Sequence, residues 1–404
     1  MDRNRFLIRL RRTRVNSPPF GAFKSFRLIP RCLRRSCSLC MAMIGILPYF
    51  LIFSSAAASN RIIADAAGRQ VEIPPTIERV ICSGAGALRL LTYLEAQDKI
   101  VAVDDMEKQR PQFDARPYAL ANPQFRDYPV FGEFRGHDHP ERILTLDPLP
   151  QVIFKTYSSM GHDPVELYRK TGIPVIVLNY GDLGKNRPAF YKSLRIMGKA
   201  IGKEKRAEAV IFFFDRMIAD LGNRVARIST DQRPGCFMGG ISFRGPHGFQ
   251  STEPAYPPFT FIKARNLAYE ASLAGKALRH SNIAKERIVT WDPDFLFLDL
   301  ATLQMGDRAG GLFELKNDLA YQSLTAVQNG NVYGVLPYNW YTQNFGSILA
   351  NAYFIGKLLY PGQFVDIEPA AKADEIYVFL VGKPVFAAMN AAFGNFVFQP
   401  IPLK

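Results

Sequence analysis

Polar and glycine residues follow several apolar, strand-like segments of the sequence, which is where open α/β sheets bind their ligands. These places are Ser83-Gly-Ala-Gly86, Thr156-Tyr157, Asn179-Tyr180 and Leu300-Ala301. The turn at Ser83 and Gly84 opens a predicted helix, so its amides are candidates to hold an anionic group. The glycines are explained equally well if close packing of this helix leaves no room for a side chain. Ser83, Gly84, Tyr157 and Tyr180 are therefore candidate ligand-binding residues.

The most polar loop of the first half, residues 132–140, carries Arg135, His137 and His139. Neutral imidazole is a common metal ligand, and His162 is the only other histidine in this half. Two loop histidines without a third histidine or a cysteine nearby seldom form a closed metal site. We predict no metal bound directly by the protein, and keep Arg135 and His137 as candidates for contact with the ligand.

A glycine-rich loop in the second half, residues 239–248, contains Arg244 and His247. A guanidinium held by such a loop suits a carboxylate or phosphate of a ligand, because its planar fork matches both groups. Arg244 and His247 are therefore candidates on the second side of a ligand site.

Aromatic side chains form two further candidate groups in the second half. Tyr256 lies among three prolines, and Tyr338, Trp340 and Tyr341 follow a predicted strand. Aromatic rings supply a large apolar contact area with polar edges, which suits a planar or chelated ligand. Packing inside the protein is the alternative for all four, and it is the preferred interpretation for Trp291.

The sequence lacks the common catalytic motifs: it contains no GxSxG elbow, no HExxH and no P-loop. Ser83, His137 and Asp104 would be the pieces of an exported metal-dependent hydrolase, which is the alternative function. They come from separate predicted strands, and no spacing unites them. We predict a binding protein with no catalytic residues and no cofactor.

Short apolar strands alternate with helical segments, which is the pattern of a parallel α/β sheet. A predicted hairpin over residues 61–74 turns at Gly68 and precedes the first of these strands. Further along, Pro188 begins a helix that Gly202 interrupts. The next helix, predicted from Glu204 to Ile228, has apolar residues three and four apart and would be about 37 Å long. It is interpreted as a stiff strut between two regions or as a long surface helix.

An internal repeat relates the two halves of the chain. Residues 141–148, Glu-Arg-Ile-Leu-Thr-Leu-Asp-Pro, recur 145 residues later at 286–293 as Glu-Arg-Ile-Val-Thr-Trp-Asp-Pro, with six of eight positions identical. Each copy indicates a helix that closes at Asp-Pro and leads into a buried strand. The predicted fold is α/β, with two Rossmann-like lobes of parallel sheets joined by a single long helix. The expected boundaries are 59–187 for the N-terminal lobe, 188–229 for the helical linker and 230–404 for the C-terminal lobe.

Over residues 62–360 the chain resembles the periplasmic binding proteins that serve ABC importers of iron–siderophores, haem and cobalamin. The resemblance is carried by the hairpin, the strand Ile77–Ser83, the segments Lys99–Asp104 and Val130–Gly132, both repeat blocks, and Asn329–Tyr333. It implies two lobes joined by one long helix, with the ligand in the cleft between them. It also implies a receptor that captures a metal chelate, of the iron–siderophore kind in our interpretation, and delivers it to a permease in the cytoplasmic membrane. Haem, cobalamin and an oxyanion complex stay open as ligands, and a monomer is expected.

The same resemblance implies a docking role for one acidic residue on each lobe, and the matching positions are Glu141 and Glu286. A carboxylate at a helix start is favoured by the helix dipole and can pair with an arginine of the permease. The alternative is that both are helix-start acids retained from a duplication.

The positive charge of the chain is concentrated at its N-terminus. The formal net charge is +14, and residues 1–58 account for +10 of it, which leaves +4 for the remainder. Because the remainder is nearly balanced, it has no global field for polyanions, and nucleic-acid binding is not expected. The arginines precede a 13-residue apolar run, Met41–Phe53, and an A-x-A site at Ala56 and Ala58.

This arrangement predicts a secretory signal peptide with a long basic extension over residues 1–58, and hence a periplasmic protein. A retained signal would instead tether the protein to the outer face of the cytoplasmic membrane. The true start codon and the export route stay open. After cleavage the chain would keep only Cys82 and Cys236, which we interpret as two buried thiols, with a disulfide between them as the alternative.

Overall fold

The computed structural model describes residues 59–109, 112–157, 161–270 and 280–403. The predicted signal peptide lies outside the described residues. Within them, no helix combines the length and the apolar character that crossing a membrane would require.

The N-terminal lobe is built on a six-stranded sheet of order β6-β5-β4-β3-β7-β8. Five strands are parallel, and the short β6 pairs antiparallel with β5. Even the edge strand Val175–Leu178 is apolar and buried on both faces, because helices or loops cover both sides of a parallel sheet. The strands are β3 (Val80–Ser83), β4 (Ile100–Asp104), β5 (Val130–Glu133), β6 (His137–Asp138), β7 (Val152–Thr156) and β8 (Val175–Leu178).

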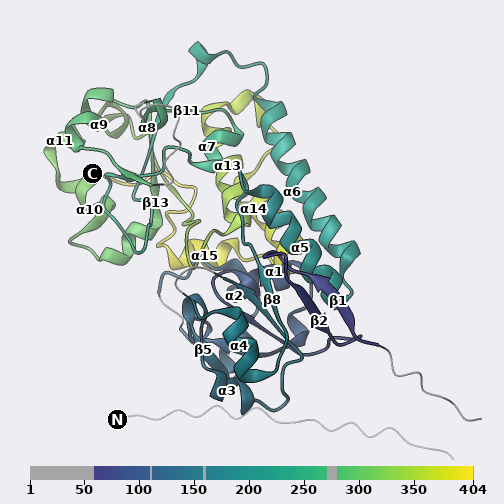
Figure 1. The fold of residues 1–404 in the computed structure, drawn as a ribbon. Helices are drawn as coiled ribbons and strands as arrows, with labels where there is room; N and C mark the ends of the chain where they lie inside the picture. The colour runs from purple at the N-terminus through teal and green to yellow at the C-terminus, as the bar shows by residue number, and fades with distance from the viewer. Residues whose placement is uncertain (1–58, 110–111, 158–160, 271–279, 404) are drawn as a thin grey trace, which may run out of the picture. The chain divides into compact units, whose positions relative to one another are not determined.

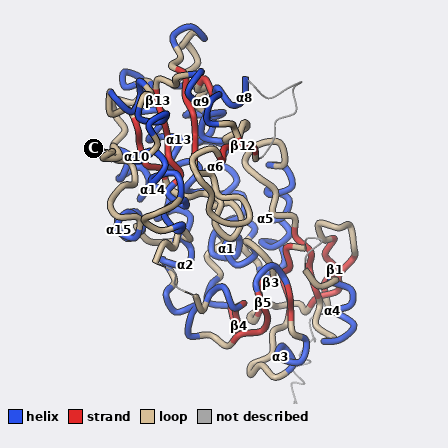
Figure 2. Tube along the Cα trace, turned by 90° about the vertical axis from the view of Figure 1, so that its left-hand side faces the viewer, coloured by secondary structure: helices blue, strands red, loops and turns tan. Residues whose placement is uncertain are grey.

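A hairpin of β1 (Arg61–Ala64) and β2 (Gln70–Ile73) precedes this sheet. Its turn contains Gly68 with a φ of 82°, a conformation that favours glycine, as the hairpin prediction required. Figure 2 shows α3 close to β5 and α4, in agreement with the contacts between these elements. The helices of this lobe are α1 (Ala87–Tyr93), α2 (Pro117–Ala121), α3 (Pro140–Leu144) and α4 (Pro164–Thr171).

The C-terminal lobe contains a four-stranded parallel sheet of order β11-β9-β13-β14 and a small β10–β12 ladder. Together with the first lobe, this sheet confirms the predicted α/β fold with parallel sheets. The strands are β9 (Gly235–Gly239), β10 (Ser251–Thr252), β11 (Arg265–Asn266), β12 (Ser281–Asn282), β13 (Phe295–Asp299) and β14 (Val332–Val335). The helices before the last strand are α7 (Pro257–Phe261), α8 (Leu267–Glu270), α9 (Lys285–Trp291), α10 (Gly310–Asn317), α11 (Leu319–Gln322) and α12 (Thr325–Gln328).

The linker consists of two helices, α5 (Arg187–Ile201) and α6 (Glu204–Arg224), which lie side by side in Figure 1. Gly202, in the left-handed conformation, ends the first helix as predicted. The second ends at Arg224 and not at Ile228, so its 21 residues span about 31 Å. Gly222 and the poor helix former Asn223 weaken its last turn, although Val225 beyond it is still buried.

The last helices of the chain, for which we made no prediction from the sequence, are α13 (Phe345–Leu359), α14 (Pro369–Val381) and α15 (Phe386–Ala392). Nearly every residue of α13 is buried. α14 packs against α13 and also against α1 and α2 of the N-terminal lobe. Buried side chains from both lobes therefore form one continuous hydrophobic cluster, which opposes free hinging between them.

The internal repeat corresponds to the same order of elements in both lobes. The first copy forms α3 before β7, and the second forms α9 before β13. Cys82 and Cys236 are both free and buried, which confirms the interpretation as two separate thiols. The predicted lobe and linker boundaries agree with this order of elements and stay predictions.

Candidate functional site

A cavity of about 610 Å³ lies at the carboxyl ends of β3, β7 and β8. Arg244 and Thr342 of the C-terminal lobe line its other side, so it lies between the two lobes. Four of the predicted ligand-binding residues are in its wall: Arg135, Tyr157, Tyr180 and Arg244. The complete lining is Ala66, Ala67, Ala85, Arg135, Thr156, Tyr157, Val177, Leu178, Asn179, Tyr180, Gly181, Asn186, Arg244 and Thr342.

Each lobe contributes an arginine to the cavity from a turn of sequence Phe-Arg-Gly. We call residues 134–136 the Arg135 turn and residues 243–245 the Arg244 turn. Arg135 has a φ of 62° and Arg244 a φ of 60°. Each guanidinium lies over the ring of the preceding phenylalanine, at 4.9 Å and 5.5 Å from the ring centre. Neither forms an ion pair with a carboxylate among the described residues, so the cavity offers two uncompensated cations to an anionic solute.

Lys155, a buried residue of β7, forms a hydrogen bond with the Arg135 turn. Its side chain is 0% exposed, and its Nζ donates to the carbonyl of Gly136 at 2.9 Å, to Ser83 Oγ at 3.0 Å and to the carboxylate of Asp138. Ser83 is therefore bonded inside the lobe and does not line the cavity, so it cannot act there as a nucleophile either. A Cβ on Gly84 would meet the carbonyl of Thr156 at 2.4 Å. Close packing therefore explains this glycine, although the neighbour is strand β7 and not the following helix.

The Arg244 turn is held by hydrogen bonds between uncharged groups. The amide of Phe243 and the hydroxyl of Ser242 both donate to the carbonyl of Gly245, at 3.0 Å and 2.9 Å. The ring of Phe243 is 39% exposed and stacks on His280 at 4.4 Å. His247 lies behind the turn, with its Nε2 at 2.7 Å from the carbonyl of Phe243, and is not part of the cavity wall.

The histidines of the first lobe form a small surface group. The rings of His137 and His162 meet edge to face at 5.4 Å, and His162 Nδ1 is 2.8 Å from the carbonyl of Asp138. His139 lies 3.4 Å from Glu133. Across the described ranges, no three histidine, cysteine or acidic side chains gather closely enough to hold a metal ion. His137 is outside the cavity wall.

Two predicted aromatic residues lie in the core of the C-terminal lobe. Tyr256 and Tyr338 are 0% and 1% exposed, and their rings meet edge to face at 5.6 Å. The hydroxyl of Tyr256 accepts a hydrogen bond from Asn351 Nδ2 at 3.2 Å. Burial raises the pKa of Tyr256 well above its ordinary value. The expectation that these rings face the cleft is corrected: apolar packing, the alternative interpretation, describes them. Trp291 packs partly buried against Phe237.

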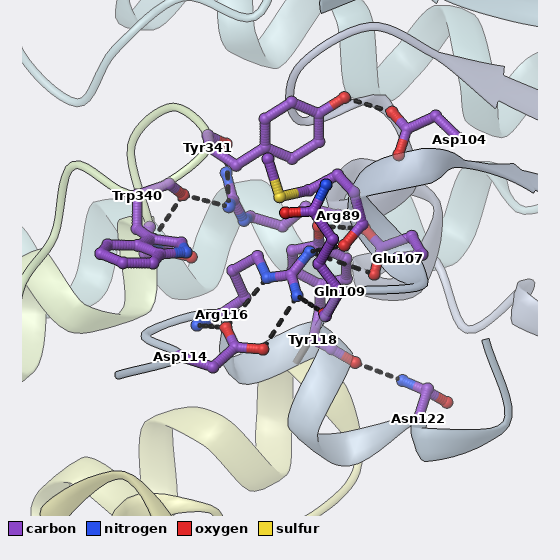
Figure 3. Close-up of polar contacts among 12 residues, drawn as sticks. Arg89, Asp104, Glu107, Gln109, Asp114, Arg116, Tyr118, Asn122, Trp340 and Tyr341 are labelled. Atoms are coloured by element: carbon purple, nitrogen blue, oxygen red, sulfur yellow. Dashed lines mark hydrogen bonds and ion pairs between the residues drawn. The ribbon is translucent and has the colours of Figure 1, made fainter. Parts of the chain in front are cut away.

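The segment Trp340–Gln343 carries the remaining predicted aromatics and contributes Thr342 to the cavity wall. Figure 3 shows Arg89 of α1 directed at this segment, with Trp340 and Tyr341 beside it. Arg89 donates to the carbonyls of Trp340 at 3.2 Å, Tyr341 at 3.2 Å and Gln343 at 2.8 Å. Tyr180 donates its hydroxyl hydrogen to the carbonyl of Gln343 at 2.6 Å. Trp340 and Tyr341 thus stand next to the cavity without lining it.

Tyr341 also reaches a buried acid of the N-terminal lobe. Its hydroxyl donates to the carboxyl group of Asp104, at the end of β4 (Figure 3). Burial, helped by the negative charge of nearby Glu107, raises the pKa of Asp104 to about 8, although the bond from Tyr341 opposes this. Asp104 is therefore mainly protonated at neutral pH. Behind it, Arg116 pairs with Glu107 at 3.4 Å and Asp114 at 2.8 Å.

Sequence reasoning missed Lys155, Arg89 and Thr342. The available signal was a charged residue inside an apolar segment, since Lys155 follows Val-Ile-Phe in a buried strand and Arg89 lies between leucines. A buried charge needs partners, and that requirement marks such residues as structurally or functionally special. Thr342 offered no comparable signal.

Glu141 and Glu286 are exposed and occupy the first turns of α3 and α9. Both lie away from the cavity wall. Their positions in the two copies of the repeat are equivalent, as the docking hypothesis requires.

A family model described as periplasmic binding protein matches residues 80–338 of the chain. The molybdate-binding protein MolA of Haemophilus influenzae is 21% identical over 352 residues, which cover 80% of this chain and 92% of that protein. The structure of MolA with bound molybdate is similar with a TM-score of 0.60 and 18% identity, over 80% of this chain and 98% of that chain.

Two other solved structures have the same fold at comparable identity. The petrobactin-binding protein YclQ of Bacillus subtilis has a TM-score of 0.51 and 17% identity, over 76% of this chain and 99% of that chain. The haem-binding protein HutB of Vibrio cholerae has a TM-score of 0.50 and 19% identity, over 70% of this chain and 99% of that chain. The three named proteins bind different solutes on one fold.

Proposed function

The chain belongs to the periplasmic binding protein family, the solute receptors of ABC importers, and we propose that its solute is an anionic metal chelate of the iron–siderophore kind. Members of this family are transport receptors and not enzymes. The observation that carries the proposal is the cavity between the lobes, with Arg135 on one side and Arg244 on the other, neither paired with a carboxylate of the described residues.

Size and charge both favour a bulky anion. A volume of about 610 Å³ lies within the range of about 300–1,000 Å³ typical of sites for drug-sized ligands. Arg135 and Arg244 can each make paired hydrogen bonds to a carboxylate or catecholate oxygen. Tyr157 and Tyr180 add aromatic surface beside them.

An oxyanion such as molybdate is the second candidate. It is supported by the similarity of the chain to MolA in both sequence and structure. Two arginines suit an oxyanion as well as a chelate, whereas the size of the cavity favours the chelate.

Titration of the purified mature protein separates these candidates. The probes are a ferric tris-catecholate, ferric citrate, haemin, molybdate, and two chelates without net negative charge, a ferric tris-hydroxamate and cyanocobalamin. We expect the ferric anions to bind at least about tenfold more tightly than the chelates without negative charge, a difference of ~1.4 kcal/mol. Tight binding of molybdate alone would establish the second candidate, and preference for a neutral chelate would contradict the charge argument.

The variant Arg135→Ala/Arg244→Ala tests the site itself. Its affinity for the preferred anion should fall, whereas Arg142→Ala, which changes an exposed arginine on α3, should bind like the parent. Equal affinities of the double variant and the parent would place the site elsewhere.

The proposed partner is a permease of the cytoplasmic membrane, contacted by a monomeric receptor through Glu141 and Glu286. Changing both to Ala should leave solute affinity unchanged and impair uptake by cells that carry the importer. A lost carboxylate costs about 2–5 kcal/mol of docking if the ion pair is desolvated, and about 0.2–1 kcal/mol if it stays exposed. Glu204→Ala, at the exposed first turn of α6, is the matched control. Normal uptake by the double variant would rule out docking through these residues.

Export is proposed to remove residues 1–58, with cleavage after about Ala58, where the small residues follow the apolar run. N-terminal sequencing of the exported protein measures this directly. A mature chain that begins upstream of Met41 would contradict it and favour the tethered form.

A further inference from the structure

We propose that Arg89 is a positioning residue for the cavity: from the N-terminal lobe it holds the Trp340–Gln343 segment of the C-terminal lobe, so that the second wall of the site is formed before any solute binds. This inference rests on the proposed function, because it concerns the same cavity.

Arg89 is buried without a carboxylate partner in the described part of the chain. Its side chain is 1% exposed, and no carboxylate among the described residues pairs with it. A buried cation is stable only if hydrogen bonds replace its water. The hydroxyl of Tyr180 in the same lobe supplies one of them, at 2.5 Å. Three backbone carbonyls of the opposite lobe supply the others, from Trp340, Tyr341 and Gln343. The rings of Tyr118 and Tyr180 add cation–π contacts at 5.0 Å and 5.7 Å.

The Trp340–Gln343 segment has an unusual backbone conformation. Tyr341 and Thr342 have φ values of 46° and 63°, a left-handed region that residues other than glycine seldom occupy. Such a conformation persists where surrounding contacts determine it. Here it turns three carbonyl groups toward one guanidinium, so that the burial of Arg89 and the shape of the segment depend on each other.

The Trp340–Gln343 segment is also connected to the residues that line the cavity. Thr342 lines the cavity itself, and the hydroxyl of Tyr341 accepts a hydrogen bond from the amide of Arg135 at 3.4 Å. Tyr180, also in the cavity wall, shares the carbonyl of Gln343 with Arg89. Release of the segment would therefore disturb both walls of the site at once.

Trp340 makes this inference measurable without any solute. The chain has two tryptophans, and Trp291→Phe leaves Trp340 as the single fluorophore. In that background we compare Arg89→Met with Arg206→Met. Arg206 is the matched control, because it also links the lobes through carbonyls, those of Tyr93 and Phe379, but lies on α6 away from the segment.

The expected result is greater acrylamide quenching of Trp340 in Arg89→Met than in the parent, with no increase in Arg206→Met. The amide of Asn344, which donates to the carbonyl of Tyr338 at 2.6 Å, should exchange at least about tenfold faster in Arg89→Met. Parental quenching and exchange in a folded Arg89→Met protein would overturn the proposal, as would equal changes in both variants.

Two further variants keep the test decisive if Arg89→Met does not fold. Tyr180→Phe removes one hydroxyl and preserves the ring, and it should raise the quenching of Trp340 by a smaller amount. Arg89→Lys retains the charge but cannot span three carbonyls, so it should restore folding without restoring protection of Trp340. Parental quenching in both of these variants would overturn the proposal.

A last comparison separates this inference from the proposed function. Affinity for a ferric tris-catecholate probe should fall by about tenfold or more in Arg89→Lys. If the parent does not bind this chelate, the comparison is made with another anionic ferric probe that it does bind. If it binds none of them, the proposed solute class is wrong, while the fluorescence result still decides the role of Arg89. If the parent binds it and Arg89→Lys binds equally well, positioning of the cavity by Arg89 is disproved.

Discussion

The Arg135 turn and the Arg244 turn have the same Phe-Arg-Gly sequence and nearly the same arginine φ, yet the protein supports them in different ways. The Arg135 turn is bonded to the buried Lys155, which also bonds to a serine and to an aspartate. The Arg244 turn is closed by a serine hydroxyl and an amide, with an exposed phenylalanine on its outer side. We therefore expect the Arg135 turn to be the more rigid of the two and the Arg244 turn to adjust more easily to a solute.

This difference indicates that the two arginines contribute differently to solute binding in the same cavity. A preorganised group loses little freedom on binding and contributes more to affinity. An adjustable group accommodates solutes of different outline at a cost in entropy. We expect the Arg135 turn to determine the affinity of the protein for the anion. The Arg244 turn should determine how much the shape of a bound anion can vary.

The largest expected effect is that of removing the support of the Arg135 turn. Lys155→Met leaves Asp138 buried without its cationic partner, which should lower the free energy of unfolding by about 3–5 kcal/mol. Ser242→Ala, the corresponding change under the Arg244 turn, should cost only about 1 kcal/mol. Urea unfolding measures both, with the exposed Lys192→Met as control. Similar losses in both variants would contradict the comparison.

The next effect concerns solute affinity. Arg135→Ala should lose about 1.5–3 kcal/mol of binding to an anionic ferric chelate, the range for hydrogen bonds to charged groups. Arg244→Ala should lose less, because its exposed side chain gives up more rotamer freedom on binding. Titration calorimetry with the same probe tests the order, and a larger loss in Arg244→Ala would reverse the assignment of the two walls.

The buried carboxyl group of Asp104 should make the stability of the protein depend on pH. Its pKa is raised to about 8 in the folded protein, against an ordinary value of about 4. Between these values the folded state binds a proton that the unfolded state lacks, so the contribution of Asp104 to stability is largest at low pH. That contribution should fall by about 1.4 kcal/mol per pH unit as the pH rises from ~4 to ~8.

Asp104→Asn should flatten this dependence, because an amide does not titrate and its oxygen can still accept the bond from Tyr341. Urea unfolding of parent and variant at pH 5, 6.5 and 8 measures the slope. Parallel pH profiles of the two proteins would show that Asp104 is already ionised across this range.

The smallest effect is expected at His247, behind the Arg244 turn. His247→Ala removes one bond to the carbonyl of Phe243, and surface substitutions of this kind usually change stability by no more than about 0.5 kcal/mol. Solute affinity should also change little. A loss comparable to that of Lys155→Met would mean that the Arg244 turn is as firmly built as its counterpart.

Several features of the molecule were predictable from local sequence patterns. Alternating apolar strands and helices predicted the parallel sheets, and the repeated Glu-Arg-Ile blocks predicted two related lobes. The rule that ligands bind beyond strand ends placed Tyr157 and Tyr180 correctly in the wall of the cavity. These features depend on residue periodicity and on chain direction, and both can be read directly from the order of the residues.

Tertiary structure alone decided which side chains face the cavity. Tyr256 and Tyr341 were equivalent candidates in the sequence, but one is closed off by Phe259 and Tyr338 and the other meets Asp104. Arg89 contacts a carbonyl 254 residues away, and Lys155 contacts a serine 72 residues away. A buried charge can be recognised from its neighbours in the sequence. Its partners cannot be recognised in this way, because they come from distant parts of the chain and meet it only when the protein folds.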